Sequence, residues 1–270
     1  MKAILSSTSD DIYLYNLPIV AWAWKQLRAE VICFSPREMG SKEIFVIQTA
    51  AAHAPGLRSV GFECPADKAA TYAQVSRLMA GALYDLPYNE LLIVSDIDMI
   101  AFSPLLSLIE PGRFNIIGVD LVPENQLPMC FLAGRTHQWQ EVMKVDGRTY
   151  QDCLDELLGP IECQNFRANQ WSFDQDTIFK YIQNSPKTLI WPVERARPGT
   201  QFANHRLDRD DQFLLDRLSP DIIDFHLPRP LWTDANHEIL MTVLKYYWPN
   251  EDFGWWERYR EQYMELMTNQ

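Results

Sequence analysis

One apolar run constrains the fold of this chain more than any other feature. The segment Leu91–Ser95 is almost wholly apolar and is followed at once by two carboxylates, Asp96 and Asp98. A run without polar alternation is typical of a strand buried on both faces, as in a mostly parallel sheet covered by helices. Ligands of open α/β sheets bind beyond the carboxyl ends of the strands. The sequence therefore predicts an α/β fold with both carboxylates at a ligand-binding edge.

The chain as a whole alternates short apolar runs with longer amphipathic stretches, which is the pattern of β-α units. We expect strands at Ala3–Ser6, Val31–Ser35, Glu43–Thr49, Leu91–Ser95, Phe114–Val119, Met129–Ala133 and Asp221–Phe225. We expect helices at Tyr13–Arg28, Asp67–Tyr84 with Asp67 as N-cap, and Asp174–Ile182, followed by an aromatic-rich helical tail at Trp232–Gln270. No linker or repeat divides residues 1–270, so we expect a single domain.

The charge balance and the cysteine content limit which binding partners and which cellular compartment we expect. The 270 residues contain 24 Lys+Arg and 36 Asp+Glu, a net charge of −12, and no basic run suited to nucleic acid. The five cysteines show no C-x-x-C spacing, as expected for reduced thiols. Neither a signal-peptide core nor a transmembrane segment is recognisable. We expect a cytoplasmic protein whose aromatic tail packs against the sheet rather than on a membrane surface.

The D-x-D spacing suggests a cation site. In an extended chain residues i and i+2 point to the same side, so Asp96 and Asp98 are expected to converge. Two hard oxygen ligands suit Mg²⁺ or Mn²⁺, with substrate phosphates completing the shell. The other two triplets have simpler interpretations: Asp174 and Asp176 are expected to cap a helix, and residues 208–211 to form a solvated face.

Several segments together resemble the GT-A glycosyltransferases, above all their glycogenin-like and bacterial lipopolysaccharide galactosyltransferase-like branch. The resemblance rests on residues 8–13 (Thr-Ser-Asp-Asp-Ile-Tyr), residues 76–78 (Ser-Arg-Leu), the Asp96/Asp98 triplet, residues 174–176 (Asp-Gln-Asp), and His226 followed by Arg229-Pro230 and Trp232. These segments span most of the chain. The resemblance implies a nucleotide-sugar-binding half at 1–135, and an acceptor half with the helical tail at 136–270.

The resemblance also implies an activity and assigns residues to it. It implies a metal-dependent transferase that moves a monosaccharide from a nucleotide diphosphate sugar, expected to be UDP-linked, to a hydroxyl acceptor such as a glycan. Asp96, Asp98 and His226 would hold Mn²⁺ or Mg²⁺. The donor would contact Thr8, Tyr13, Arg77, Ser95, Asp96 and Arg229, with Tyr13 on the uracil ring. Asp174 and Gln175 would lie at the sugar of a retaining enzyme, whereas an inverting enzyme would use Asp174 as general base.

Simpler roles stand beside these. Arg77 also fits a surface position on a helix, Tyr13 the first apolar contact of its helix, and His226 a hydrogen-bonded structural residue. The unusually apolar segment 127–132 lies where the family has a sugar-binding stretch, which leaves hexosyl and pentosyl transfer both open.

Two other classes of protein remain possible interpretations of the sequence. A haloacid-dehalogenase-like phosphatase would use Asp96 as nucleophile, but Met99 and Ile100 stand where such enzymes carry Gly-Thr. A non-catalytic carbohydrate-binding protein of the same fold is the second alternative, since nine tryptophans suit a sugar-stacking surface as well as a core.

Overall fold

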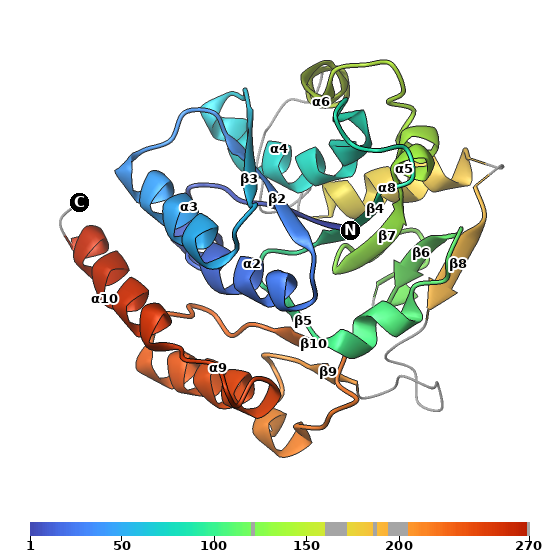
Figure 1. Cartoon of the computed structure of the whole chain (residues 1–270). Helices are drawn as coiled ribbons and strands as arrows, with labels where there is room; N and C mark the ends of the chain where they lie inside the picture. The colour runs from blue at the N-terminus through green and yellow to red at the C-terminus, as the bar shows by residue number, and fades with distance from the viewer. Residues whose placement is uncertain (120–121, 160–171, 186–187, 194–204, 269–270) are drawn as a thin grey trace.

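The computed structural model describes residues 1–119, 122–159, 172–185, 188–193 and 205–268 (Figure 1). Its strands are β1 (Lys2–Ser6), β2 (Glu30–Pro36), β3 (Arg58–Phe62), β4 (Leu91–Ser95), β5 (Met99–Ala101), β6 (Phe114–Ile117), β7 (Phe131–Arg135), β8 (Ile190–Val193), β9 (Arg206–Leu207) and β10 (Asp224–His226). Its α-helices are α1 (Asp11–Leu14), α2 (Leu17–Gln26), α3 (Ser41–His53), α4 (Ala69–Ser76), α5 (Thr136–Met143), α6 (Tyr150–Leu158), α8 (Phe173–Gln183), α9 (Asp234–Tyr247) and α10 (Gly254–Thr268). Short 3₁₀ helices are η1 (Ala66–Lys68), η2 (Arg77–Ala82), η3 (Ser103–Leu108) and η5 (Leu214–Arg217).

A seven-stranded sheet in the order β3-β2-β1-β4-β7-β6-β8 forms the centre, and a smaller sheet in the order β5-β10-β9 lies beside it. β1 runs parallel to β2 and β4, as does β2 to β3 and β6 to β8, whereas β7 runs antiparallel to both of its neighbours. The α/β fold with a mostly parallel sheet is therefore confirmed.

The central strand β4 explains the apolar run that dominates the sequence. Ile93 packs into the core that α2 and α3 form on one face, while Leu92 and Val94 pack into the core that α4, α5, α6 and α8 form on the other. All three side chains have no exposed surface. A strand covered on both faces tolerates no polar alternation, which is the reason that Leu91–Ser95 is apolar throughout.

The strand expected at Glu43–Thr49 is wrong, because these residues belong to helix α3. The apolar residues 44–47 have high strand propensity, which favoured the strand interpretation. The buried positions of the helix are Val46 and Ala50, four residues apart, and Ile44 is exposed. Burial thus follows the helical period rather than the alternation of a strand. The strand beside β2 is β3, which the sequence analysis missed.

Two expected helices are divided. Tyr13–Arg28 contains α1 and α2, with Pro18 in the first turn of α2, where its missing N–H is tolerated. Asp67–Tyr84 contains η1, α4 and η2. Asp67 lies inside η1 and is not the N-cap of α4, a position that Lys68 occupies, so its expected capping role is wrong.

The aromatic tail packs into the body of the protein, as the sequence predicted. Trp256, Tyr259 and Tyr263 of α10 surround Tyr15, with ring centroids 4.9 to 5.2 Å away. The Tyr259 hydroxyl donates to the carbonyl of Tyr15 at 3.0 Å. The C-terminal helices are therefore part of the hydrophobic core.

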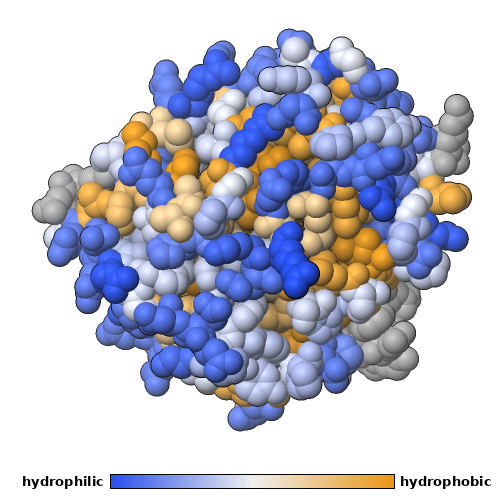
Figure 2. All heavy atoms as spheres, in the orientation of Figure 1, coloured by the Kyte–Doolittle hydropathy of each residue, from blue (hydrophilic) through white to orange (hydrophobic). Residues whose placement is uncertain are grey.

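The surface carries apolar side chains in separate patches. Figure 2 shows these patches among hydrophilic side chains on one face of the molecule. Exposed apolar residues of this kind are usual on soluble folds. None of the helices in the described ranges combines the length and apolarity needed to cross a bilayer.

We expect Trp256→Ala to lower the free energy of unfolding by about 3–5 kcal/mol, since it removes a fully buried indole from the contact between α10 and the body. Urea denaturation followed by circular dichroism measures this loss. The matched control is Trp191→Ala, because Trp191 is 39% exposed and is expected to cost about 1 kcal/mol or less. Equal losses in the two variants would contradict the tail's place in the core.

Candidate active site

The chain turns sharply where β4 ends, and this turn separates the two carboxylates of the D-x-D triplet. After Ser95 the chain leaves the extended conformation, and the Met99 N–H donates to the Asp96 carbonyl at 3.3 Å before β5 begins. Side chains at i and i+2 share a side only in extended chain. Asp96 and Asp98 therefore diverge, contrary to the expectation from their spacing, and each joins a different cluster.

Arg77 organises the first cluster from the junction of α4 and η2. Its Nη1 donates to Asp96 Oδ1 at 2.5 Å and to the Ser95 carbonyl at 3.0 Å, and its Nη2 donates to Asp174 Oδ2 at 2.7 Å. Burial alone would lower the pKa of Arg77, but the carboxylates of Asp96 and Asp174 raise it above its ordinary value. Arg77 is thus a buried partner of Asp96 and not a surface residue.

Asp174 stands in this cluster rather than at a helix cap. Ser172 occupies the N-cap position of α8, and Asp174 lies in the first turn with 3% of its surface exposed. Its Oδ1 accepts the Gln175 N–H at 2.9 Å, while Oδ2 is bound to Arg77. Burial raises the pKa of Asp174, and the Arg77 guanidinium opposes this rise. The capping role expected for Asp174 is therefore wrong. The next residue, Gln175, is half-buried beside the cluster.

The small sheet builds the second cluster through its register. β10 pairs antiparallel with β5 so that His226 lies opposite Met99, the neighbour of Asp98. β10 also pairs in parallel with β9, with Phe225 opposite Leu207, which brings Asp208 next to His226. Residues more than 100 positions apart in the sequence therefore meet at one end of this sheet.

Three donors converge on one oxygen of Asp98. Asp98 Oδ2 accepts hydrogen bonds from Arg229 Nη2, from Arg209 Nη1 at 3.0 Å and from His226 Nε2 at 3.1 Å. Burial alone would raise the pKa of Asp98, but these cationic neighbours hold it well below its usual range. Asp98 is consequently an ionised carboxylate in a nearly closed setting, with 5% of its side chain exposed.

His226 lies between two carboxylates. Its Nδ1 is 3.6 Å from Asp208 Oδ1, and its Nε2 faces Asp98. Burial lowers the pKa of His226, but Asp208 and Asp98 outweigh it and raise the pKa above the ordinary value. The neighbouring His226 and Arg206 likewise hold the pKa of Asp208 below its usual range. His226 at a strand end is confirmed.

The sequence analysis missed Asp208 and Arg209, which it placed on a solvated face. That expectation is wrong for both residues, because each contacts the Asp98 cluster. The available signal was the position of the charges directly after the apolar Leu207, at the end of a short strand. A strand of two residues is too short for periodicity to reveal it.

Arg229 also contacts Tyr13 of α1. The guanidinium carbon lies 4.4 Å from the centre of the Tyr13 ring, and Nη1 donates to the Tyr13 hydroxyl at 3.1 Å. Burial raises the pKa of Tyr13, although the charge of Arg229 opposes this rise. The guanidinium thus lies over the ring that the sequence assigned to the uracil, and uracil stacking by Tyr13 stays a prediction.

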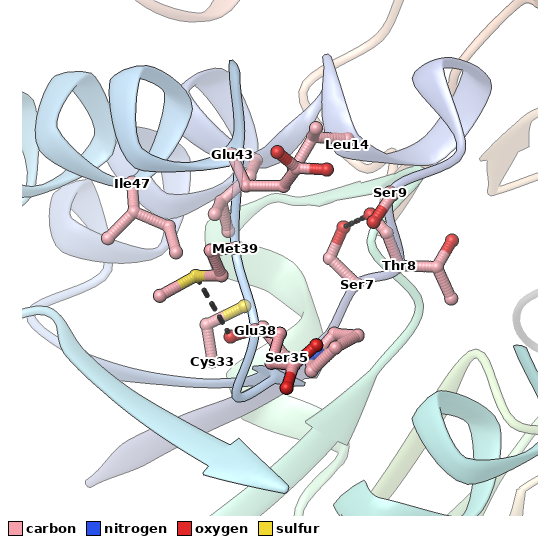
Figure 3. Close-up of a pocket in the computed structure, with 12 residues that line it drawn as sticks. Ser7, Thr8, Ser9, Leu14, Cys33, Ser35, Glu38, Met39, Glu43 and Ile47 are labelled. Atoms are coloured by element: carbon pink, nitrogen blue, oxygen red, sulfur yellow. Dashed lines mark hydrogen bonds between the residues drawn. The ribbon is translucent and has the colours of Figure 1, made fainter. Parts of the chain in front are cut away.

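Thr8 lies at a recess between the ends of β1 and β2 and the start of α3. Figure 3 shows Ser7 and Ser35 from the two strand ends and Glu43 from the helix around this recess. Its volume of about 10 Å³ corresponds to roughly one water molecule, so the recess does not hold a nucleobase as it stands. Thr8 Oγ1 accepts the Asp10 N–H at 3.1 Å, and Asp10 in turn caps the helix that carries Tyr13.

The donor set does not fit a divalent ion. In the described part of the chain no three His, Cys, Asp or Glu side chains are grouped so that they could hold a metal. Asp98 Oδ2 already accepts three hydrogen bonds, and Asp96 is bound to Arg77 in the other cluster. His226 Nε2 faces the same Asp98 oxygen that the two guanidinium groups contact.

No protein-family model matches this sequence, and no curated protein matches it. Solved structures do resemble it in fold. The crystal structure of the galactosyltransferase LgtC with donor and acceptor sugar analogues aligns over 90% of this chain and 95% of its own, at 10% identity and a TM-score of 0.51. An active-site mutant of LgtC aligns with the same values. The apo form of the glycosyltransferase GlyE of Streptococcus pneumoniae TIGR4 aligns over 98% of this chain and 63% of its own, at 9% identity and a TM-score of 0.49. The fold expected from the resemblance, GT-A, is confirmed by the LgtC alignments.

We expect Arg77→Met to lower the free energy of unfolding by about 3–5 kcal/mol, because it leaves Asp174 buried without its partner. Urea denaturation measures the loss, and adding Asp174→Asn to the variant should recover part of it by removing the unpaired charge. The control is Arg58→Met, whose exposed pair with Asp85 is expected to contribute less than about 1 kcal/mol. No difference between Arg77→Met and the control would refute the central place of Arg77.

Proposed function

We propose that this chain, which has the GT-A fold, is a glycosyltransferase that moves a monosaccharide from a nucleotide diphosphate sugar to a hydroxyl group of a glycan or similar acceptor. The observation that carries the proposal is the pair of charged clusters at the carboxyl end of β4, where open α/β sheets bind ligands. One cluster offers the half-exposed carboxylate of Asp96, and the other offers Arg209 and Arg229. We expect the nucleotide to be uridine.

The reaction needs an acceptor substrate with a hydroxyl group, and cationic groups near the diphosphate of the donor. The bond between the anomeric carbon and the diphosphate oxygen breaks, and that carbon forms a bond to the acceptor oxygen. The acceptor proton passes to the departing diphosphate in the retaining reaction that we propose. Negative charge gathers on the diphosphate, so preorganised donors near it lower the barrier. Arg209 and Arg229 are such donors, since guanidinium groups match phosphate oxygens in geometry.

Asp96 is suited to bind a hydroxyl group of the donor. Its side chain is 33% exposed, and one oxygen is fixed by Arg77. Arg77 itself uses Nε, Nη1 and Nη2 on protein acceptors, so we assign it to the positioning of Asp96 rather than to the phosphates or ribose.

The buried position of Asp174 favours retention over inversion. Asp174 is 3% exposed, and both of its carboxylate oxygens accept hydrogen bonds within the protein, so it is poorly placed to take a proton from an acceptor. A general base must lie within hydrogen-bond reach of the proton it removes. We therefore propose that Asp174 holds the cluster together, and that the half-buried Gln175 faces the donor sugar.

The apolar segment 127–132, which runs into β7, does not identify the sugar. Leu127, Met129 and Leu132 are buried in the core between the sheet and its helices. Their apolar character therefore follows from packing, and transfer of a hexose and of a pentose both remain within the proposal.

A divalent cation is not part of this proposal. Mn²⁺ or Mg²⁺ was expected from the resemblance, but the donor set around Asp98 does not fit such an ion. We derive no step through a metal ion.

The proposal is tested by incubating the protein with a panel of UDP- and GDP-linked hexoses and pentoses and measuring release of the nucleoside diphosphate, with water in place of the acceptor. We expect release from one donor, and a decrease of about 10- to 100-fold in Asp96→Ala, the range expected for a lost hydrogen bond to a charged group. The matched control is Asp146→Ala, an exposed aspartate, which should release at the rate of the unchanged protein.

Two outcomes would reject the proposal. Hydrolysis of p-nitrophenyl phosphate that is lost in Asp96→Ala would indicate the phosphatase alternative. Binding of oligosaccharides without release from any donor would indicate the carbohydrate-binding alternative.

A further inference from the structure

We infer that Arg209 and Arg229, held in place by Asp98, bind the diphosphate of the donor and neutralise it without a divalent cation. The inference rests on the proposed function, because it concerns the donor of that reaction. It names the chemistry that recognises the leaving group: a pair of guanidinium groups that meet on one buried carboxylate.

The two guanidinium groups that contact Asp98 outnumber that carboxylate. Asp98 contributes one negative charge, and Arg209 and Arg229 contribute two positive charges, so the three groups carry a net charge of +1. The side chains of Arg209 and Arg229 are 21% and 22% exposed, whereas that of Asp98 is 5% exposed. The two arginine side chains are thus more exposed than the carboxylate that they contact, an arrangement that favours an anion over a cation.

Both guanidinium groups are ordered before a ligand arrives. Asp98 fixes one nitrogen of each, and the Tyr13 ring and hydroxyl hold Arg229 from a second side. A guanidinium has five N–H donors, and Arg209 spends one of them on Asp98 in the described structure. N–H donors that are already positioned and do not yet donate a hydrogen bond can bind phosphate oxygens with little loss of side-chain entropy.

The same contacts oppose a metal ion at this place. A cation on Asp98 Oδ2 would have to displace two guanidinium groups, and a cation on either oxygen would lie beside their positive charge. The carboxylate of Asp208, which could compensate, faces His226 instead. Taken together, the two clusters pair three carboxylates with three guanidinium groups, so their charges cancel. The carboxylates are those of Asp96, Asp98 and Asp174, and the guanidinium groups are those of Arg77, Arg209 and Arg229. The arginines thus supply the charge that a divalent ion would bring to two acidic ligands.

Calorimetric titration tests this inference. UDP and GDP are titrated into the full chain in EDTA and again in Mn²⁺, with uridine and guanosine as probes without phosphate. We expect the better-bound diphosphate to bind in EDTA within about twofold of its affinity in Mn²⁺. In Arg209→Gln/Arg229→Gln its affinity should fall by about 100-fold or more, from roughly tenfold or more for each lost charge-assisted bond, while nucleoside binding is unchanged.

Two further variants separate the inference from a loss of fold. Arg148→Gln removes an exposed arginine paired with Glu156 and should bind like the unchanged protein. Asp98→Asn keeps an oxygen that accepts from the two arginines but removes the negative charge that opposes an anion, so it should tighten diphosphate binding by about two- to fivefold in EDTA. A metal site would respond in the opposite way, because Asp98→Asn would remove a ligand.

The outcomes distinguish this inference from the proposed function. Diphosphate binding and donor release that both require Mn²⁺ and vanish in Asp98→Asn would overturn the inference and leave the glycosyltransferase standing. Diphosphate binding that is unchanged in the double arginine variant would also overturn it. No nucleotide binding and no donor release in either buffer would overturn both.

Discussion

The buried carboxylate of Asp98 is the acceptor on which the charged end of this fold depends. A buried charge is costly unless it is paired, and removal of a partner is more damaging than its presence is stabilising. Asp98 is paired with three hydrogen-bond donors, which are the side chains of Arg209, His226 and Arg229. Its ionisation therefore fixes the positions of the segments that carry them relative to β4. One oxygen atom couples the central sheet to the small sheet and, through Tyr13, to the first helix.

The arrangement follows from how β4 ends. The strand is buried on both faces, so its polar residues are confined to the point where it leaves the sheet. The turn that follows sends Asp96 to one side, where Arg77 and α8 receive it, and leads Asp98 into the small sheet. A straight continuation would have placed both carboxylates together. The turn thus produces two charged clusters instead of one acidic site: in one, Arg77 faces two carboxylates, and in the other, Asp98 faces two guanidinium groups.

Sequence patterns predicted what depends on local chemistry and long apolar runs. Strand β4, the position of its carboxylates at the strand end, and His226 at a strand end followed from such patterns. They did not reveal the contacts that register decides. Asp208 reaches His226 because β9 pairs with β10, and two residues of strand carry no periodic signal. The error at α3 has a similar origin, since four apolar residues in a row fit a strand until the burial of Val46 and Ala50 shows the helical period.

The charge of the chain as a whole does not oppose a diphosphate ligand. A net charge of −12 is spread over the surface, and salt at physiological strength screens exposed charges beyond about 8 Å. A bound phosphate therefore responds to the groups within a few ångströms, and near Asp98 these include two guanidinium groups that are partly exposed and paired with the same carboxylate. The free-energy cost of bringing the two guanidinium groups together is met when the chain folds around Asp98, and not when the ligand binds. For the same reason arginine is better suited than lysine at both positions, because a lysine has no second nitrogen with which to hold Asp98 and a phosphate oxygen in one plane.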